Sequence, residues 1–117
     1  MTLDLASGYW QLQVNEEDIA KTAFACHRGL FEFVRMPFGL FNAPAMMQRA
    51  LDMLLAKIKW ETCLIYLEDI ITHGSTFPLM LHNLEEIFEL LETADLKLKS
   101  SKCFFGFDHV NYLGHVV

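Results

Sequence analysis

The segment CLIYLEDIIT, residues 63–72, places two adjacent acidic residues inside a short apolar run. Residues 63–67 and 70–72 each have the length and apolar content of a buried strand, so we expect a hairpin with Glu68 and Asp69 at its tip. Two-residue hairpin turns favour Asn-Gly or Asp-Gly, because both central residues take a positive φ. Glu-Asp is therefore a poor choice for a turn that has only a structural role.

Adjacent carboxylates repel each other unless a cation neutralises them, and their oxygens are the hard ligands that Mg²⁺ prefers. Asp4 lies near the end of another strand, expected at residues 2–5. Antiparallel pairing of that strand with the hairpin would bring Asp4 beside Glu68 and Asp69. Three carboxylates on neighbouring strands suit a mechanism with two metal ions about 3.5–4 Å apart. Solvated acidic side chains at a turn and a strand end are the alternative, which these residues leave open.

The rest of the sequence predicts an α+β domain in the order strand, hairpin, helix, hairpin, helix, strand. Before the first helix, strands are expected at residues 22–26 and 31–36, with Gly29 in the turn between them. Asn42 is the expected N-cap of the first helix, and apolar residues then recur at intervals of three and four. The two helices are therefore expected to cover one face of an antiparallel sheet.

The second helix is expected to begin near Thr76 and Pro78 and to end near Thr93. A basic loop follows at residues 95–103, and residues 110–117 are expected to form a terminal strand. Lys97, Lys99 and Lys102 fit either phosphate contacts or a solvated loop, and their number favours the loop. Tyr9 and Trp10 likewise fit either a nucleotide pocket or a core, and composition favours the core.

The composition is that of a globular chain, with 53% hydrophobic and 21% charged residues, and 117 residues are enough for one core. The formal net charge of -6 argues by itself against nucleic-acid binding, which usually needs a basic face. The 3 Cys form no disulfide or metal-binding pattern, so we expect a reducing, intracellular setting, cytoplasmic or nuclear. No apolar run reaches the roughly 20 residues of a membrane span.

Taken together, these segments resemble the reverse transcriptases of gypsy-type LTR retrotransposons. The similar runs lie in order at family spacing along nearly all 117 residues: DLASGYWQ (4–11), KTAF (21–24), FEF (31–33), MPFGL (36–40), NAPA (42–45), QR (48–49), YLEDI (66–70), LKL (96–98), KC (102–103) and YLGH (112–115). The resemblance implies the palm of a right-hand polymerase with part of a finger hairpin. Residues 1–117 are then a fragment, with the N-terminal fingers, the thumb and the RNase H region missing.

The same resemblance implies RNA-directed DNA polymerase activity by two-metal nucleotidyl transfer on an RNA or DNA template-primer with a dNTP. Asp4, Glu68 and Asp69 are the implied catalytic residues and ligands of Mg²⁺ or Mn²⁺. Tyr9 would sit under the incoming sugar, where a bulky ring excludes a 2′-hydroxyl. The implied nucleotide-binding residues are Tyr9, Trp10, Pro37, Phe38, Gly39 and Gln48, and the implied primer-positioning residues are Tyr66, Leu113 and Gly114.

One departure from the family pattern bears on activity. Glu68 stands where the family has the first Asp of its Tyr-x-Asp-Asp block. A glutamate reaches about 1 Å further, whereas catalytic geometry has to hold within roughly 0.5 Å. The isolated chain is therefore expected to be inactive. It is also expected to be poorly soluble, because apolar surface that the fingers and thumb would cover is left exposed. The alternatives are a working module of a longer polyprotein and a host-adopted, non-catalytic binding module that keeps the palm fold.

Overall fold

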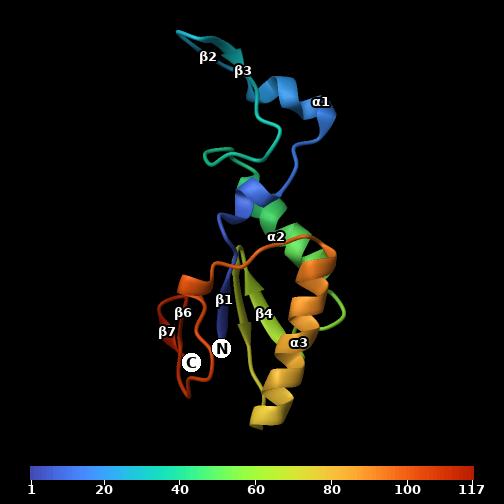
Figure 1. Ribbon diagram of the computed structural model, residues 1–117, viewed down its shortest axis with the longest axis vertical. Coiled ribbons are helices and arrows are strands. Elements are labelled where there is room, and N and C mark those ends of the chain that lie inside the picture. Colours follow the sequence, from blue (N-terminus) through green and yellow to red (C-terminus); the bar gives the residue numbers. More distant parts are fainter.

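A three-stranded antiparallel sheet is the centre of the computed structural model, which describes residues 1–117 (Figure 1). Its strands are β1 (Thr2–Asp4), β5 (Asp69–Thr72) and β4 (Cys63–Tyr66), in that spatial order. The middle strand, β5, pairs on both sides, and its residues after Asp69 are buried. The first strand of the chain is thus held by a hairpin formed much later in the sequence.

Two long helices, α2 (Ala43–Leu54) and α3 (Phe77–Thr93), share one core with this sheet. Their buried side chains recur at helical spacing, as the sequence predicted. The core residues are Met1, Leu3, Leu5, Met47, Leu51, Leu55, Cys63, Ile70, Leu84, Ile87 and Leu91. The predicted α+β class, with helices packed on an antiparallel sheet, is confirmed. None of the helices has the length and apolar character needed to cross a membrane.

The caps of the two helices differ from each other. Thr76 is the N-cap of α3, and its hydroxyl accepts a hydrogen bond from the Leu79 N–H at 3.4 Å. Asn42 occupies the N-cap position of α2, as predicted, but its side chain makes no capping hydrogen bond. Pro44 in the first turn of α2 has no N–H to satisfy, which reduces the need for that bond.

A segment formed by residues 8–31 extends from one end of the sheet and helices (Figure 1). It contains η1 (Gly8–Gln11), α1 (Glu16–Ile19), η2 (Ala20–Thr22) and the hairpin of β2 (Phe24–Cys26) and β3 (Gly29–Phe31). The strand predicted at residues 31–36 is therefore wrong in its bounds. Beyond Phe31 the chain leaves β2 and pairs with residues 12–14. The Val14 N–H donates to Val34 O, and the Met36 N–H donates to Leu12 O.

The C-terminal part also differs from its prediction. After η3 (Ser100–Lys102), residues 110–117 form a hairpin of β6 (Asn111–Tyr112) and β7 (His115–Val116) instead of one strand. Leu113 and Gly114 take φ values of 51° and 82°, which is the conformation of a tight two-residue hairpin turn. A glycine adopts it without strain, and Gly114 thus ends the strand that the alternating pattern had suggested.

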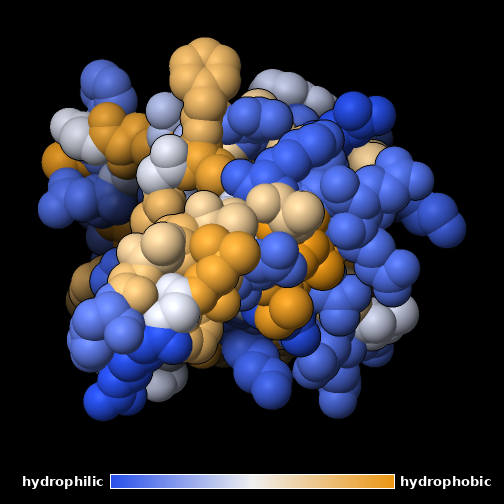
Figure 2. Space-filling view, turned by 90° about the horizontal axis from the view of Figure 1, so that it is seen from above, coloured by the Kyte–Doolittle hydropathy of each residue, from blue (hydrophilic) through white to orange (hydrophobic).

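Several large apolar side chains are exposed. Figure 2 views the molecule from its β2–β3 end and shows apolar residues gathered near the middle of that face, with an aromatic ring projecting outward. Phe41 is 100% exposed, and Leu30 in β3 is 68% exposed. Apolar surface of this kind is the physical basis of the expected low solubility, which stays a prediction.

Replacing Leu51 by alanine tests the packing of α2. Leu51 is 0% exposed, so Leu51→Ala leaves a cavity and should lower the free energy of unfolding by about 2–5 kcal/mol. Met53 lies on the same helix and is 70% exposed, so Met53→Ala should change it by less than about 0.5 kcal/mol. Urea denaturation of both variants measures the difference. Equal losses would show that the buried face of α2 has been assigned wrongly.

Candidate active site

Asp4 and Asp69 lie directly opposite each other, at the end of β1 and the start of β5. Opposite residues of an antiparallel pair have Cβ atoms about 4.5–5.5 Å apart and point to the same face. The two carboxylates therefore meet on one side of the sheet. Burial, and then the neighbouring charge of Asp4, raise the pKa of Asp69 above its ordinary value. Ionisation of Asp69 is therefore disfavoured at this position of the sheet.

Lys102 supplies the nearest positive charge to this pair. Its Nζ lies 3.1 Å from Oδ2 of Asp4, in a salt bridge that joins η3 to β1. The hydrogen bond to Asp4 and the charges of Asp4, Glu68 and Asp69 raise the pKa of Lys102. The Lys102 side chain is 55% exposed, so the predicted solvated loop agrees with its position. The salt bridge to Asp4 was not predicted, because it depends on how η3 packs beside β1.

Glu68 takes a different place from the one predicted for it. The turn of the hairpin is formed by Leu67 and Glu68, and Asp69 already belongs to β5, so the two carboxylates are not both at the tip. Leu67, not an acidic residue, has the positive φ of 54°. The Glu68 carboxylate lies against η1, since a Cβ added at Gly8 would be 3.0 Å from Glu68 Oε2.

The three predicted metal ligands do not converge. No group of three His, Cys, Asp or Glu side chains in the chain is arranged to hold one metal ion. Asp4 and Asp69 by themselves fit a divalent cation, because they offer facing hard oxygen donors and their mutual repulsion would fall on binding. Metal binding by this pair stays a prediction, and so does the role of Glu68 as a third ligand.

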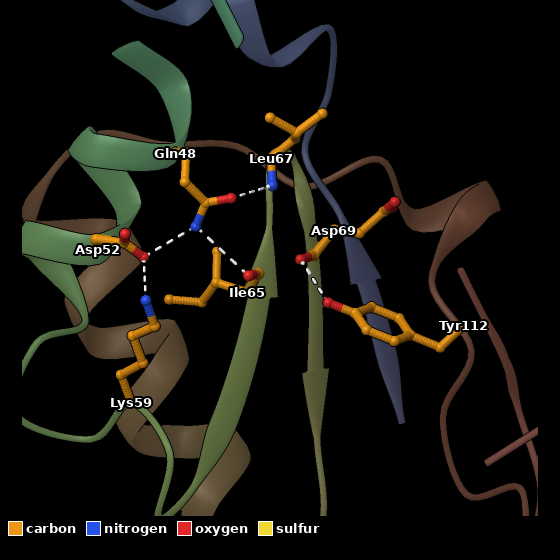
Figure 3. Close-up of polar contacts among 7 residues, drawn as sticks. All are labelled: Gln48, Asp52, Lys59, Ile65, Leu67, Asp69 and Tyr112. Carbon is orange, nitrogen blue, oxygen red and sulfur yellow. Dashed lines mark hydrogen bonds and ion pairs between the residues drawn. The ribbon is translucent and has the colours of Figure 1, made fainter. Parts of the chain in front are cut away.

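A small cavity of about 230 Å³ opens beside the acidic pair. The hairpin β6–β7 forms one wall of it: Leu113 lines the cavity, whereas Gly114 does not. Tyr112 connects this hairpin to β5, because its hydroxyl donates a hydrogen bond to the Asp69 carbonyl oxygen at 3.4 Å (Figure 3). Burial raises the pKa of Tyr112 to about 12, so the hydroxyl keeps its proton at neutral pH.

The predicted nucleotide-binding aromatics come together. The rings of Tyr9 and Phe38 are 5.2 Å apart, and those of Trp10 and Phe38 are 6.0 Å apart. Trp10 is 40% exposed, so the expectation that it belongs to the core is wrong. Pro37 and Gly39 flank Phe38, and Gly39 has a φ of 91° that permits the bend there. Whether this cluster binds a nucleotide stays a prediction.

Gln48 and Tyr66 both lie at the hairpin that carries Asp69. Tyr66 is the last residue of β4, pairs with Asp69 in register and is 50% exposed. Gln48 reaches the turn from α2, where its Oε1 accepts from the Leu67 N–H at 2.8 Å (Figure 3). The resemblance implied that Gln48 binds the nucleotide, and in the structure its amide contacts the backbone of the hairpin. Its nucleotide-binding role stays a prediction.

The family model described as "Reverse transcriptase (RNA-dependent DNA polymerase)" matches residues 1–117. Among curated proteins, the retrovirus-related Pol polyprotein from transposon 297 of Drosophila melanogaster is 43% identical over 116 residues, which are 99% of this chain and 11% of that protein. The corresponding polyprotein from transposon gypsy of the same species is 36% identical, with the same coverage of 99% and 11%. The chain thus spans about a tenth of the length of these relatives.

Solved structures agree with the fold. The foamy viral protease–reverse transcriptase in complex with an RNA/DNA hybrid is 27% identical, with a TM-score of 0.90 over 98% of this chain and 15% of that chain. A form of the same protein in complex with double-stranded DNA gives a TM-score of 0.91 at 27% identity, over 99% of this chain and 22% of that one. These likenesses confirm the predicted palm-like α+β fold.

Replacing Asp69 by asparagine should stabilise the metal-free chain at neutral pH. The folded-state pKa of Asp69 is raised, so its ionised form destabilises the fold at pH values above that pKa, and the cost disappears once folded and unfolded chains are both protonated. Asp69→Asn should therefore raise the free energy of unfolding by a few tenths to about 1 kcal/mol at neutral pH and have little effect near pH 3. Denaturation in a chelating buffer at both pH values measures this.

The control is Glu85→Gln, which removes a carboxylate from an exposed position of α3. It should change the free energy of unfolding by less than about 0.5 kcal/mol at both pH values. A loss of stability on Asp69→Asn at neutral pH would mean that the Asp69 carboxylate is held by attractive contacts instead of opposing Asp4.

Proposed function

This chain belongs to the reverse transcriptase (RNA-dependent DNA polymerase) family, and we propose that residues 1–117 are the palm, with part of the fingers, of a retrotransposon polymerase. The proposed reaction is nucleotidyl transfer from a dNTP to a primer on an RNA or DNA template. The single observation that supports it best is the register of β1 and β5, which sets Asp4 opposite Asp69 next to a cavity. Two facing carboxylates beside an open space are suited to binding a cation and a phosphate together.

Each part of the site has a proposed role. Asp4 and Asp69 would hold Mg²⁺ or Mn²⁺, which when bound supplies Lewis-acid stabilisation of charge on a phosphate. Lys102 limits the negative charge of the acidic pair through its salt bridge to Asp4. The hairpin β6–β7, with Leu113 at the cavity wall, would place the primer end.

The aromatic cluster is proposed to receive the nucleotide. Tyr9 belongs to η1 and packs on Phe38 with ring centroids 5.2 Å apart, which fixes the orientation of its ring. A ring held in this way can exclude a 2′-hydroxyl from a pocket that accepts a deoxyribose. Trp10 and the bend at residues 37–39 would form the rest of the wall of this nucleotide pocket.

Glu68 is the feature that argues against full activity. Its carboxylate lies beside Gly8, and it forms no three-residue metal-binding group with Asp4 and Asp69. An extra methylene at this position displaces the carboxyl by about 1 Å, and a displacement of that size can cost about 10²-fold in rate. We therefore propose that the chain by itself is inactive and that polymerisation, if retained, needs the other parts of a longer polyprotein, of which it spans about a tenth in its relatives.

A non-catalytic binding module that keeps the palm fold is the second candidate. The observation that favours it is the absence of a converging group of three carboxylates or other metal-binding side chains. In that case the fold would persist for binding a partner, without a requirement for magnesium.

Primer extension by a graft distinguishes these proposals. The matching segment of the transposon 297 polyprotein, 43% identical, is replaced by this chain, and extension on an RNA template is measured with Mg²⁺ and then with Mn²⁺. The Glu68→Asp graft should extend a primer about 10²-fold faster than the unmodified graft, because the carboxyl returns to the shorter reach. Asp69→Asn in the same graft should abolish extension.

Each result has a clear meaning. Equal rates for the unmodified and Glu68→Asp grafts would show that glutamate is tolerated and that the palm is competent. Failure of both grafts, with a cooperative unfolding transition that shows them to be folded, would overturn the polymerase proposal and support the binding module. The unmodified transposon 297 protein serves as the positive control.

A further inference from the structure

The turn between β4 and β5 is held from outside by the side chain of Gln48. Leu67, the first residue of the turn, has a φ of 54°, a conformation that costs a non-glycine residue about 1–2 kcal/mol. Its N–H donates to Gln48 Oε1 at 2.8 Å, and Gln48 Nε2 lies 3.4 Å from the carbonyl oxygen of Ile65. One side chain on α2 thus contacts the backbone of the hairpin on both sides of Tyr66.

The orientation of the Gln48 amide is fixed by Asp52. Gln48 Nε2 donates to Asp52 Oδ1 at 2.9 Å, one helical turn further along α2. A flipped amide would set its NH₂ group against the Leu67 N–H and its oxygen against the carboxylate, and both contacts would be repulsive. Asp52 therefore determines which end of the amide faces the turn.

Asp52 is held in turn by Lys59, from the loop that joins α2 to β4. Lys59 Nζ donates to the same Oδ1 at 2.6 Å, and the Lys59 side chain is only 18% exposed. Lys59 Nζ also lies 5.1 Å from the centre of the Trp60 ring, which covers it further. The hydrogen bond from Lys59 lowers the pKa of Asp52, so the carboxylate stays charged.

We propose that Lys59, Asp52 and Gln48 form a positioning relay (Figure 3). The relay fixes the β4–β5 turn, and with it Glu68 and Asp69, relative to Asp4. The inference rests on the proposed function, because it assigns the relay to the proposed catalytic hairpin. Asp52 and Lys59 are positioning residues, since neither lines the cavity beside Asp4 and Asp69. Gln48 and Asp52 have a rigid base, because Met47 and Leu51 beside them are fully buried.

A surface salt bridge without a positioning role would have different consequences. Exposed ion pairs contribute little to stability, and removing one affects the whole fold weakly and evenly. The relay instead requires that its loss quickens hydrogen exchange at the Leu67 amide in particular. The amide of Thr72 is a reference within the same hairpin, because it donates to the Met1 carbonyl oxygen and does not contact Gln48.

Amide hydrogen exchange of the full 117-residue chain tests this directly. In Asp52→Asn and Lys59→Met, exchange at Leu67 should quicken roughly 2- to 10-fold, the effect of one hydrogen bond, while exchange at Thr72 stays unchanged. Lys59→Arg keeps the charge and should restore slow exchange at Leu67. Lys57→Met is the matched control, because Lys57 is exposed and forms no salt bridge, and it should change neither amide. Unchanged exchange at Leu67, or equal acceleration at both amides, would overturn the relay.

The grafted polymerase gives the functional result. In the Glu68→Asp graft, Asp52→Asn and Lys59→Met should lower kcat several-fold and by a larger factor than they raise KM for the dNTP, because the hairpin is misplaced while the aromatic cluster of the nucleotide pocket is intact. Lys59→Arg should recover most of kcat. Unchanged kcat in an active graft would overturn the relay as a catalytic device. Complete inactivity of every graft would overturn the proposed function, and hydrogen exchange at Leu67 would then decide the relay by itself.

Discussion

The pairing of β1 with β5 is the constraint on which the rest of the structure depends. It sets Asp4 opposite Asp69 in register while Leu3 and Ile70 enter the core from the same two strands. A shift of one residue would turn every side chain to the other face, so the apolar residues that bury also fix where the carboxylates meet. Core packing thereby stabilises an acidic pair that would otherwise separate.

Two glutamine side chains extend this constraint to segments outside the sheet. Gln11 donates to the carbonyl oxygens of Ala6 and Lys97, each at 2.8 Å, and accepts from the Lys97 N–H at 2.7 Å. It thereby fixes the loop that leads to Lys102. Gln48 does the same for the turn after β4. Both are long, neutral side chains that offer a donor and an acceptor together, which lets each one hold more than one backbone group.

The order of elements could be predicted from the sequence because local patterns specify it. The face of α2 follows from the spacing of Met47, Leu51 and Leu55, and α3 begins at the threonine that the pattern suggested. The bounds near Phe31 could not be predicted, because residues 34–36 pair with residues 12–14 and that partner is distant in the sequence. The C-terminal hairpin was missed because Leu113 gives no sign of its positive φ.

The sequence by itself determined the family, the α+β class, and the three acidic residues at the candidate site, because these depend on residue types and their spacing along the chain. Only the tertiary structure decided that Asp4 and Asp69 face each other, that Glu68 lies against Gly8, and that Lys102 neutralises Asp4. It also decided that Asp52 and Lys59 act on a turn that neither residue touches. The reason is physical: charges and amides act over a few ångströms, and which of them come that close is set by strand register and by helix packing.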